Sequence, residues 1–361
     1  MSIIPSIFND TMPSYTAVGG KERGASTGLS AVLLNRGGRY PRRTLFQELE
    51  KVGFDYIISV EGPQERYDLE DLCNRFPSVR FLLLREDLSP GEQINLAVSE
   101  LSSPFFFVLW NDLRIIHSGG AAKIAEWLFY SREERRGEPK LLNKRLCTVP
   151  HIQNAQFEPL PTLIAPVFFR RSRIKTLFFA SQREGLATLY PFDGVGIYDR
   201  DRFVLLGGYD NTLKSPHWQF MDFGFRAYLW GEEIRSTQLV RLSYNGEIPS
   251  EDSTAEESYR RFYLKNLAPV FRGDMAQLPW RRFPGYLFRA GGDPFLAAAD
   301  FAEGRRWVKT NCYRFRGDAR SVTERWDPPT EERPLSGLSL SEKGNFTPSG
   351  LGRPFQKWVK P

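Results

Sequence analysis

Short apolar runs recur through the first third of the chain and predict a set of buried strands. The runs cover residues 29–34, 55–60, 79–84 and 105–110. Runs of this length without polar alternation are typical of strands that are covered on both faces of a sheet. Between them lie segments with apolar residues at helical spacing, near residues 41–53, 69–73 and 91–101. Four strands that alternate with three helices predict parallel βα units joined by right-handed crossovers.

The remaining two thirds of the chain mix helical patterns with short apolar runs. Apolar spacing predicts helices at 119–136, 219–230, 253–271 and 294–308, and strands at 160–169, 195–198 and 203–206. Gly, Pro and Arg dominate residues 273–293 and predict a loop, whereas the pattern around 146–190 fits neither element well. The predicted division is an arm (1–28), two halves of one α/β domain (29–118 and 119–250), a helical extension (251–325) and a Pro- and Gly-rich tail (326–361).

Each of the four strands predicted in the first part ends in polar side chains. These are Asn35 and Arg36, then Glu61, then Arg85, and finally Asn111 with Asp112. The carboxyl ends of parallel strands meet at one edge of a sheet, where open α/β sheets bind ligands. The sequence has neither the Gly-x-Gly-x-x-Gly of dinucleotide enzymes nor the Walker lysine loop, so a diphosphate at this edge would need a metal ion. Asp112 is the candidate metal ligand, and a strand-ending turn is the alternative interpretation.

The segment 219–230 is apolar around almost the whole circumference of the helix that it predicts. A helix that is apolar all round is a buried helix. Asp222 and Arg226 are its only charged residues, four positions apart on one narrow strip. Two interpretations stay open: an internal ion pair, which this spacing allows, or an acid that faces a cleft.

Composition narrows the class of protein. With 361 residues, 41% of them hydrophobic, the chain can form one large or two medium domains. A net charge of +6 favours an anionic partner, and because no nucleic-acid recognition motif is present we expect no nucleic acid. Three widely spaced cysteines predict a reducing, cytoplasmic location and exclude a disulfide scaffold or a structural zinc site. The amino terminus lacks a signal-peptide pattern, and no apolar run approaches the ~18 residues of a membrane span.

Arginines cluster beside tryptophans in the last third of the chain. They are Arg281, Arg282, Arg305 and Arg306, next to Trp280 and Trp307. Basic side chains beside amphipathic aromatic rings favour peripheral contact with anionic lipid, here at the inner face of the membrane. A solvated basic face is the alternative interpretation.

From residue 29 to about residue 270 the chain resembles the family 2-type glycosyltransferases with the GT-A fold. Ala31–Arg36 and Ile57–Glu61 resemble the family's opening strands, and Gly91, Asn95 and Ala97 its Gly-x-x-x-Asn-x-Ala helix. Val108–Asp112 stands in the place of its Asp-x-Asp metal motif. The turn before and including Asp210 (Leu-Gly-Gly-Tyr-Asp) is similar to the family's Gly-Gly-Phe-Asp turn. Asp222, Arg226 and Gly231 resemble the end of its acidic helix.

This resemblance implies an α/β, GT-A-type, Rossmann-like sandwich with a mostly parallel central sheet. It implies transfer of a sugar from a nucleotide-diphosphate sugar to a hydroxyl of a carbohydrate or lipid-linked acceptor, in the synthesis of envelope polysaccharide or glycolipid. Mn²⁺ or Mg²⁺ would bind to Asp112, and Asp222, or else Asp210, would be the catalytic base. The donor would bind to Asn35, Arg36, Glu61, Arg85, Asn95, Asn111 and Asp112.

The chain also departs from the family's pattern. Trp110 or Asn111 stands where the metal motif has its first Asp, and Gln219 and Phe220 replace the acid pair before the helix. The segment 239–244 lacks the histidine that some relatives use as a metal ligand. Two alternatives therefore stay open: a binding or scaffold protein without turnover, and a nucleotidyltransferase that uses Gly37, Gly38 and Arg39 as a phosphate loop.

Overall fold

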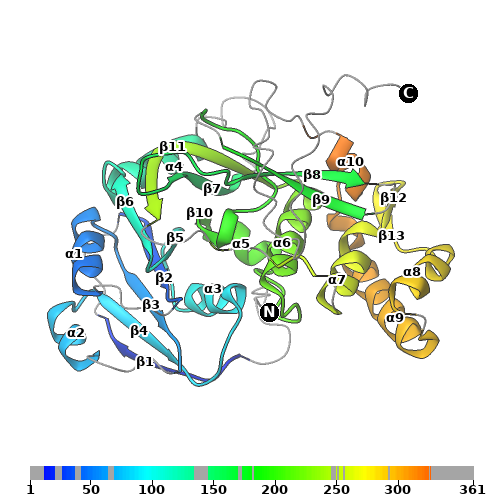
Figure 1. The fold of residues 1–361 in the computed structure, drawn as a ribbon, viewed down its shortest axis with the longest axis horizontal. Coiled ribbons are helices and arrows are strands. Elements are labelled where there is room, and N and C mark those ends of the chain that lie inside the picture. The colour runs from blue at the N-terminus through cyan, green and yellow to red at the C-terminus, as the bar shows by residue number, and fades with distance from the viewer. Residues whose placement is uncertain are drawn as a thin grey trace.

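A nine-stranded sheet runs through the body of the protein in the computed structural model (Figure 1). The structure describes residues 12–20, 27–36, 42–63, 69–133, 145–169, 173–180, 183–244, 249, 252–254, 257–291, 293–324 and 326. The strands of the sheet are β1 (Tyr15–Gly19), β2 (Leu29–Leu34), β3 (Ile57–Glu61), β4 (Val79–Leu84), β5 (Phe105–Trp110), β6 (Leu113–His117), β7 (Arg145–Gln153), β10 (Gly196–Asp199) and β11 (Glu233–Tyr244). Their order across the sheet is β1-β4-β3-β2-β5-β10-β7-β11-β6.

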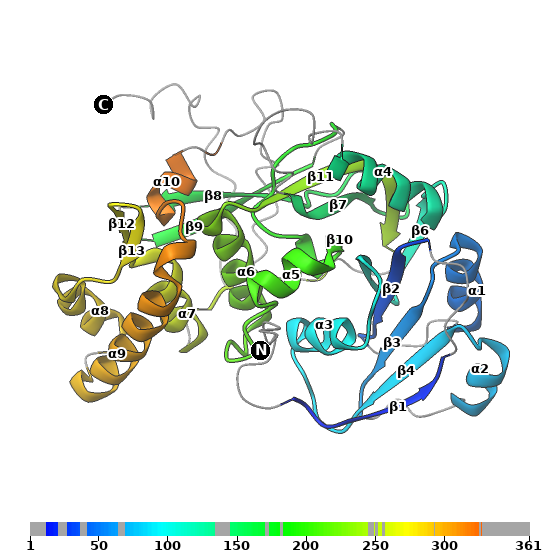
Figure 2. The ribbon, with the colours of Figure 1, turned by 180° about the vertical axis from the view of Figure 1, so that it is seen from behind.

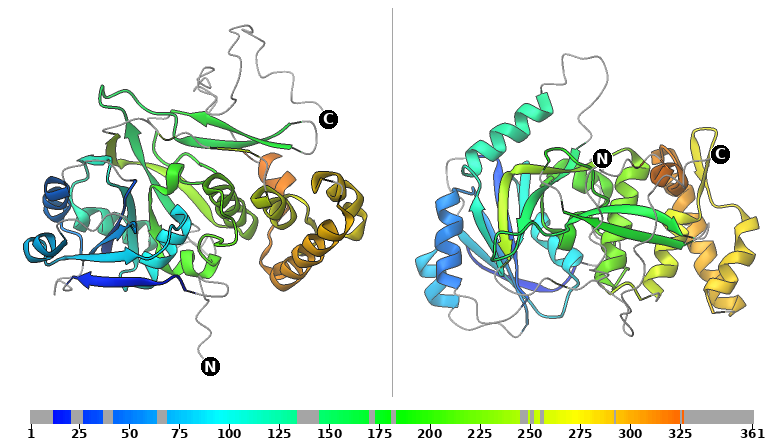
Figure 3. Two further views of the ribbon diagram at one scale, coloured as in Figure 1. Left: turned by 60° about the horizontal axis from the view of Figure 1, so that its bottom comes forward. Right: turned by 45° about the horizontal axis from the view of Figure 1, so that its top comes forward.

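The four strands β4, β3, β2 and β5 form the parallel part of the sheet, as predicted. Three helices connect them: α1 (Arg42–Val52), α2 (Leu69–Arg75) and α3 (Pro90–Ser99). α1 and α2 lie on one face of the sheet and α3 on the other (Figure 3). This arrangement follows from right-handed crossovers, because the chain moves outward from β2 to β4 and then returns past β2 to β5. The predicted βα units are confirmed.

Strand β5 lies at the centre of the sheet and is buried along its whole length. All six residues of β5 and all six of β2 are buried. Phe106 of β5 stacks on Tyr198 of β10 with ring centroids 4.9 Å apart, and Phe203 packs edge-on against Phe106. The core therefore extends from the parallel strands into the second half of the chain. Because β5 is buried along its whole length, the position of the residues at its carboxyl end is well defined.

The second half adds antiparallel strands to the sheet. β10 pairs antiparallel with both β5 and β7, while β11 runs parallel to β7 and carries β6 at the edge. α4 (Ala121–Glu133) precedes β7, and a separate hairpin consists of β8 (Leu163–Phe169) and β9 (Arg173–Phe179). The predicted strands at 160–169 and 195–198 are confirmed, whereas β6, β7, β9 and β11 were not predicted.

The predicted strand at 203–206 is wrong, because these residues belong to helix α5 (Arg200–Leu206). The Asp199 side chain caps this helix by accepting a hydrogen bond of 3.1 Å from the Arg202 backbone N–H. Gly207 ends it with a positive φ of 88°, which glycine adopts without strain. A four-residue apolar run does not distinguish a strand from one buried helical turn, so the two caps decide the conformation.

The carboxyl-terminal part is helical and lies at the end of the molecule opposite the parallel strands (Figure 2). It follows the long buried helix α6 (Pro216–Trp230), which was predicted. Its elements are α7 (Glu257–Phe262), the π-helical segment η3 (Tyr263–Leu267), β12 (Val270–Arg272), β13 (Met275–Gln277), η4 (Trp280–Arg282), α8 (Phe283–Arg289), α9 (Pro294–Asn311), η5 (Cys312–Arg314) and α10 (Ala319–Glu324).

Two expectations for this part need correction. The helix predicted at 253–271 runs only from 257 to 267, and Phe271 lies in strand β12. The segment predicted as a loop at 273–293 contains β13, η4 and α8. Its prolines lie just before η4 and in the first turn of α8, where proline is compatible with a helix. The predicted tail after residue 326 lies outside the described residues, as does most of the predicted arm. Among the described helices, none is both long and apolar enough to cross a membrane.

Candidate functional site

Polar and aromatic side chains converge where β2, β5 and β11 end. Arg36 follows β2, Trp110 ends β5, Asn111 and Asp112 follow it, and Tyr244 ends β11. Asp193 joins them from the short 3-10 turn η2 (Phe192–Gly194). We call this group the strand-end cluster: Arg36, Trp110, Asn111, Asp112, Asp193 and Tyr244.

Arg36 lies at the centre of the strand-end cluster. Its Nε is 3.2 Å from Asp112 Oδ2, and its Nη2 forms an ion pair with Asp193 Oδ2. The guanidinium carbon lies 4.0 Å from the centre of the Trp110 ring, a cation–π arrangement. The Arg36 backbone N–H also donates to Asn111 Oδ1 over 3.3 Å. One guanidinium therefore holds together residues from three separate elements.

Asp112 is buried and only half paired. Its Oδ1 has no hydrogen-bond partner among the described residues, whereas Oδ2 is paired with Arg36. Burial raises the pKa of the Asp112 carboxyl above its ordinary value, although the positive charge of Arg36 acts in the opposite direction. An unpaired buried carboxylate oxygen is costly, so this group is expected to need a further partner.

Asp193 was not predicted from the sequence, although it is the second carboxylate of the cluster. Its backbone φ of 57° is unusual for a residue other than glycine and turns the chain back toward β5. The Trp110 Nε1–H donates to the Asp193 carbonyl over 2.9 Å, and the Tyr244 hydroxyl donates to Asp193 Oδ2 over 3.2 Å. Nothing in the pattern of apolar residues indicates this turn, because it depends on how β10 and β11 pair.

Three other predicted donor-site residues lie around or away from the cluster. Asn35 donates from Nδ2 to the Val60 carbonyl over 2.7 Å and so joins β2 to β3. Glu61 is fully buried between the Ser59 hydroxyl at 2.6 Å and Arg42 Nη2 at 2.5 Å. Arg85 is exposed at the end of β4, and no contact within the described residues links its side chain to the cluster.

Asn95 has a clear positioning role in the structure. From α3 it donates through Nδ2 to the Tyr209 carbonyl over 2.7 Å and accepts from the Tyr209 N–H over 2.9 Å. The turn that contains Gly208 and Tyr209 is thereby attached to α3. Gly208 has a φ of 62°, and a Cβ there would lie 2.4 Å from Asn95 Oδ1, so the turn needs glycine at this position.

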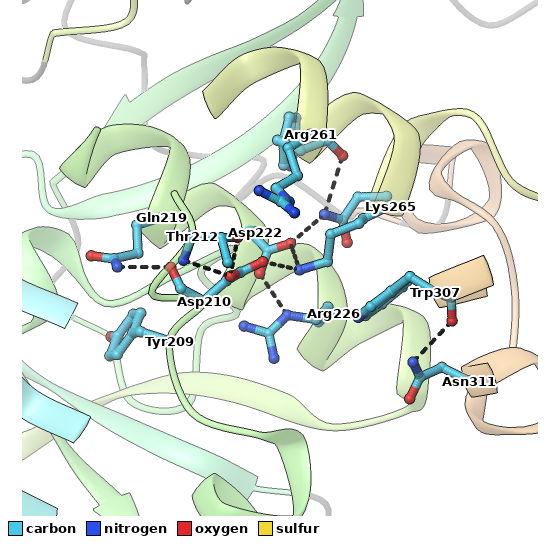
Figure 4. A network of polar contacts seen from close by, with 12 residues as sticks. Tyr209, Asp210, Thr212, Gln219, Asp222, Arg226, Arg261, Lys265, Trp307 and Asn311 are labelled. Atoms are coloured by element: carbon cyan, nitrogen blue, oxygen red, sulfur yellow. Dashed lines mark hydrogen bonds and ion pairs between the residues drawn. The ribbon is translucent and has the colours of Figure 1, made fainter. Parts of the chain in front are cut away.

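Asp222 lies within a buried set of charges and not at the strand-end cluster (Figure 4). Its Oδ2 accepts from Arg226 Nε over 2.6 Å, and its Oδ1 accepts from Asn266 Nδ2 over 2.7 Å and lies 3.0 Å from Lys265 Nζ. Lys265 Nζ also lies 2.5 Å from Asp210 Oδ2. We call Asp210, Asp222, Arg226, Lys265 and Asn266 the buried charge network.

The buried charge network also holds the turn that contains Gly208 and Tyr209. Arg226 donates to the carbonyls of Leu206 and Gly208 over 2.8 and 2.7 Å. Although burial alone would raise the pKa of the Asp210 carboxyl, the Lys265 ammonium and the Thr212 hydroxyl lower it below its ordinary value. A carboxylate with a lowered pKa is a weak proton acceptor.

Gln219 stands where the resemblance places one acid of an acid pair, and it links the first turn of α3 to the loop that contains Asp210. It accepts from the Gly91 N–H over 3.0 Å and donates to the Asp210 carbonyl over 2.9 Å. Both ends of this buried amide therefore bind backbone groups. The residue cannot act as an acid or a base, and its contacts position α3 against the turn.

A cavity of about 320 Å³ adjoins the buried charge network at the carboxyl-terminal helices. Trp307 lines one side, and Lys265 Nζ lies 4.6 Å from the centre of its ring. The other lining residues are Asp210, Thr212, Glu257, Arg261, Leu264, Lys265, Asp300, Glu303 and Gly304. Asp210 is the predicted site residue that reaches this cavity, whereas Asp222 does not line it.

The strand-end cluster does not fit a divalent metal ion. Within the described ranges, no three His, Cys, Asp or Glu side chains lie together as a metal site would require. The two carboxylates present, Asp112 and Asp193, are each paired with Arg36, which leaves Asp112 Oδ1 as a lone buried oxygen. Mg²⁺ and Mn²⁺ prefer about six oxygen ligands, several of them from carboxylates or phosphates. The cluster therefore offers too few free oxygen ligands for a divalent ion.

Comparison with protein families gives no match, and comparison with curated proteins gives none. Among solved structures, GalNAc-T7 with UDP, GalNAc and Mn²⁺ matches with a TM-score of 0.52 and 13% identity, over 82% of this chain and 57% of that chain. S. aureus TarS matches with a TM-score of 0.45 and 11% identity, over 78% and 55%. TarS 1-349 matches with a TM-score of 0.39 and 12% identity, over 78% and 72%.

Proposed function

We propose that this chain, which has the GT-A fold of glycosyltransferases, binds a nucleotide-diphosphate sugar at the strand-end cluster and transfers the sugar to an acceptor hydroxyl. The observation that carries the proposal is the convergence of Arg36, Asn111 and Asp112 at the carboxyl edge between β2 and β5. That edge is where open α/β sheets bind their ligands. GalNAc-T7, which this chain resembles in fold over 57% of that protein's length, was solved with UDP, GalNAc and Mn²⁺.

The described residues divide into those that would contact the donor and those that position them. Arg36 is the one cation in the strand-end cluster and would contact the diphosphate. Arg42, held by the fully buried Glu61, would lie on the nucleoside side. Asn95, Asp210 and Asp222 hold the turn between α5 and α6, so we propose that they are positioning residues. Asp222 is fully buried, and Asp210 is buried with its pKa lowered by Lys265, so neither carboxylate has the properties of a general base.

A second candidate is nucleotide-sugar binding without turnover. The specific observation in its favour is that Gln219 replaces an acid and spends both ends of its amide on backbone groups. Asp222 is fully buried, so it cannot replace the missing acid without a rearrangement. The phosphate loop of the nucleotidyltransferase alternative, residues 37–39, lies outside the described residues.

We expect a nucleotide sugar to stabilise the protein against heat, because a ligand that binds only the native state raises the midpoint of unfolding. The measurement is a thermal-shift panel of UDP-, GDP- and dTDP-sugars, followed by calorimetry on any that bind. Release of free nucleoside diphosphate in the presence of sugar acceptors then separates transfer from binding alone. A panel without any binding at saturating concentrations would contradict the proposal.

We propose that contact with a lipid-linked acceptor involves the turn between α8 and α9. Phe288 and Phe295 lie on either side of this turn and are 85% and 86% exposed, and Leu296 is exposed next to them. The exposed Arg281 and Arg282 lie shortly before α8. Arg305, also predicted to bind lipid, instead donates to the Leu278 carbonyl over 2.6 Å. Exposed aromatic residues beside basic ones are typical of proteins that bind anionic membrane surfaces. The role in envelope polysaccharide or glycolipid synthesis stays a prediction.

We expect the protein to float with anionic liposomes at low salt and to lose this binding when Phe288 and Phe295 are both replaced by serine. Leu205→Ser is the matched control, since Leu205 is also exposed but lies on α5. The reason for the expected loss is that apolar insertion and charge attraction act together at a membrane surface. Equal flotation of the double variant and the native protein would contradict the proposed contact.

A further inference from the structure

We propose that the Arg36 guanidinium takes the place of a divalent cation in the strand-end cluster, so that the site binds its anionic ligand without metal. The identity of that ligand, a nucleoside diphosphate or its sugar ester, rests on the proposed function. The occupation of the cluster by Arg36 does not rest on it, because it follows from contacts between this chain's own residues.

The first step is the position of the guanidinium between the two carboxylates. Its Nε and Nη2 are buried and lie against Asp112 and Asp193 respectively. Because one side chain separates the carboxylates and neutralises an oxygen of each, a metal ion cannot bind both without displacing it. The Trp110 ring below the guanidinium, at 4.0 Å, and the Asn111 contact to its backbone oppose such a displacement.

The second step is the charge of the cluster. When all three groups are ionised, the two carboxylates and the guanidinium have a net charge of −1. Without Arg36 the net charge would be −2, which would attract a divalent ion more strongly. Burial also raises the pKa of the Asp112 carboxyl, whereas the Arg36 guanidinium lowers it. The charge of the two carboxylates is therefore partly compensated by the protein's own cation.

The third step is what the guanidinium can still bind. Within the described residues no hydrogen bond or ion pair involves Nη1, and the Arg36 side chain keeps 23% of its surface exposed. A guanidinium has five N–H donors in a planar fork and binds phosphate oxygens by strong, charge-assisted hydrogen bonds. A diphosphate at the strand ends would meet the free edge of a cation that is already oriented by its two carboxylates.

The first experiment compares the binding of UDP, GDP and dTDP to the native protein in EDTA and in Mn²⁺ by calorimetry. We expect the same dissociation constant in both for any nucleotide that binds, and a loss of about 10- to 100-fold in affinity for Arg36→Gln, the contribution of a charged hydrogen bond. Binding that is tenfold or more tighter in Mn²⁺ would overturn the proposal. Absence of binding in both would contradict the proposed function, and the second experiment then decides this inference separately.

The second experiment needs no nucleotide and measures Mn²⁺ itself by electron paramagnetic resonance. We expect the native protein to leave the spectrum of free Mn²⁺ unchanged. Arg36→Gln should bind Mn²⁺ saturably and gain thermal stability from it, because Asp112 and Asp193 then lack their cation. Adding Asp112→Asn to that variant should abolish the gain. Arg114→Gln is the control, since Arg114 forms an exposed pair with Glu48 and should gain nothing.

The outcomes separate cleanly. Saturable Mn²⁺ binding by the native protein would show that Arg36 does not occupy the cation's place. Failure of a folded Arg36→Gln protein to bind Mn²⁺ would show that the carboxylates form no cation site even when they are free. Should Arg36→Gln not fold in EDTA, the same variant is refolded in Mn²⁺, since only a bound cation could restore the fold. Failure to refold in Mn²⁺ would contradict the proposal.

Discussion

Replacing Asp222 by asparagine is expected to lower the free energy of unfolding by about 3–5 kcal/mol, as measured when one partner of a buried ion pair is removed. Asp222 is fully buried and faces Arg226, Lys265 and Asn266 at 2.6–3.0 Å. Asparagine keeps the size of the side chain but leaves two buried cations with one carboxylate fewer. Chemical denaturation at neutral pH measures the loss.

Asp71→Asn is a closely matched control for this experiment. Asp71 pairs with Arg75 four residues later, the same spacing as Asp222 and Arg226, but it is exposed on α2. Because water screens that pair, its removal should change stability little. If Asp222→Asn instead kept full stability and lost sugar transfer, Asp222 would be a catalytic base, which was the sequence-based preference.

Replacing Lys265 by methionine is expected to destabilise the protein by a similar amount, about 3–5 kcal/mol at pH 7. Lys265 Nζ lies 2.5 Å from Asp210 and 3.0 Å from Asp222, and its side chain is buried under Trp307. Methionine fills the same volume without charge, so the loss reports the two carboxylates that remain. The measurement is the free energy of unfolding as a function of pH.

The loss of stability in Lys265→Met is expected to depend on pH. In the native protein the pKa of Asp210 is lowered, so its contribution to stability is present above the ordinary carboxyl pKa of 3.8 and is lost as the pH falls below it. In Lys265→Met the Asp210 carboxylate has lost the cation that favours its charged form. Protonation of Asp210 then removes an unpaired buried charge and offsets part of the destabilisation. The two stability curves should therefore converge at acidic pH. A difference that stayed constant with pH would show that Lys265 acts by packing alone.

The sequence predicted the parallel part of the fold well because burial on both faces leaves a strong signal. β2, β4 and β5 begin and end at the predicted residues. β3 begins two residues later than predicted, because the Asp55 side chain accepts a hydrogen bond from the Gly28 backbone and belongs to a loop. Strands β6, β7 and β11 were missed: β6 and β11 mix exposed with buried residues, and β7 contains a proline.

The candidate site could be predicted only as far as strand order determines it. Arg36, Asn111 and Asp112 meet because β2 and β5 are parallel neighbours, which the alternation of strands and helices already implied. Asp193 and Tyr244 depend on how β10, β7 and β11 insert beside β5, and no local pattern encodes that order. Lys265 and Asn266 lie within the predicted helix 253–271, but the segment is π-helical, so a 3.6-residue period does not give the face on which they lie.

At the edge of the sheet opposite β6, β1 pairs antiparallel with β4 and covers the outer hydrogen-bonding groups of β4. β4 carries the sequence Val-Arg-Phe-Leu-Leu-Leu, the kind of apolar segment that recruits strands from other molecules when its edge is bare. β1 is only five residues long, and it ends at two glycines of positive φ that turn the chain away from the strand direction. A short, twisted margin offers little template for a foreign strand. We expect β1 to hinder edge-to-edge pairing between molecules in concentrated solution.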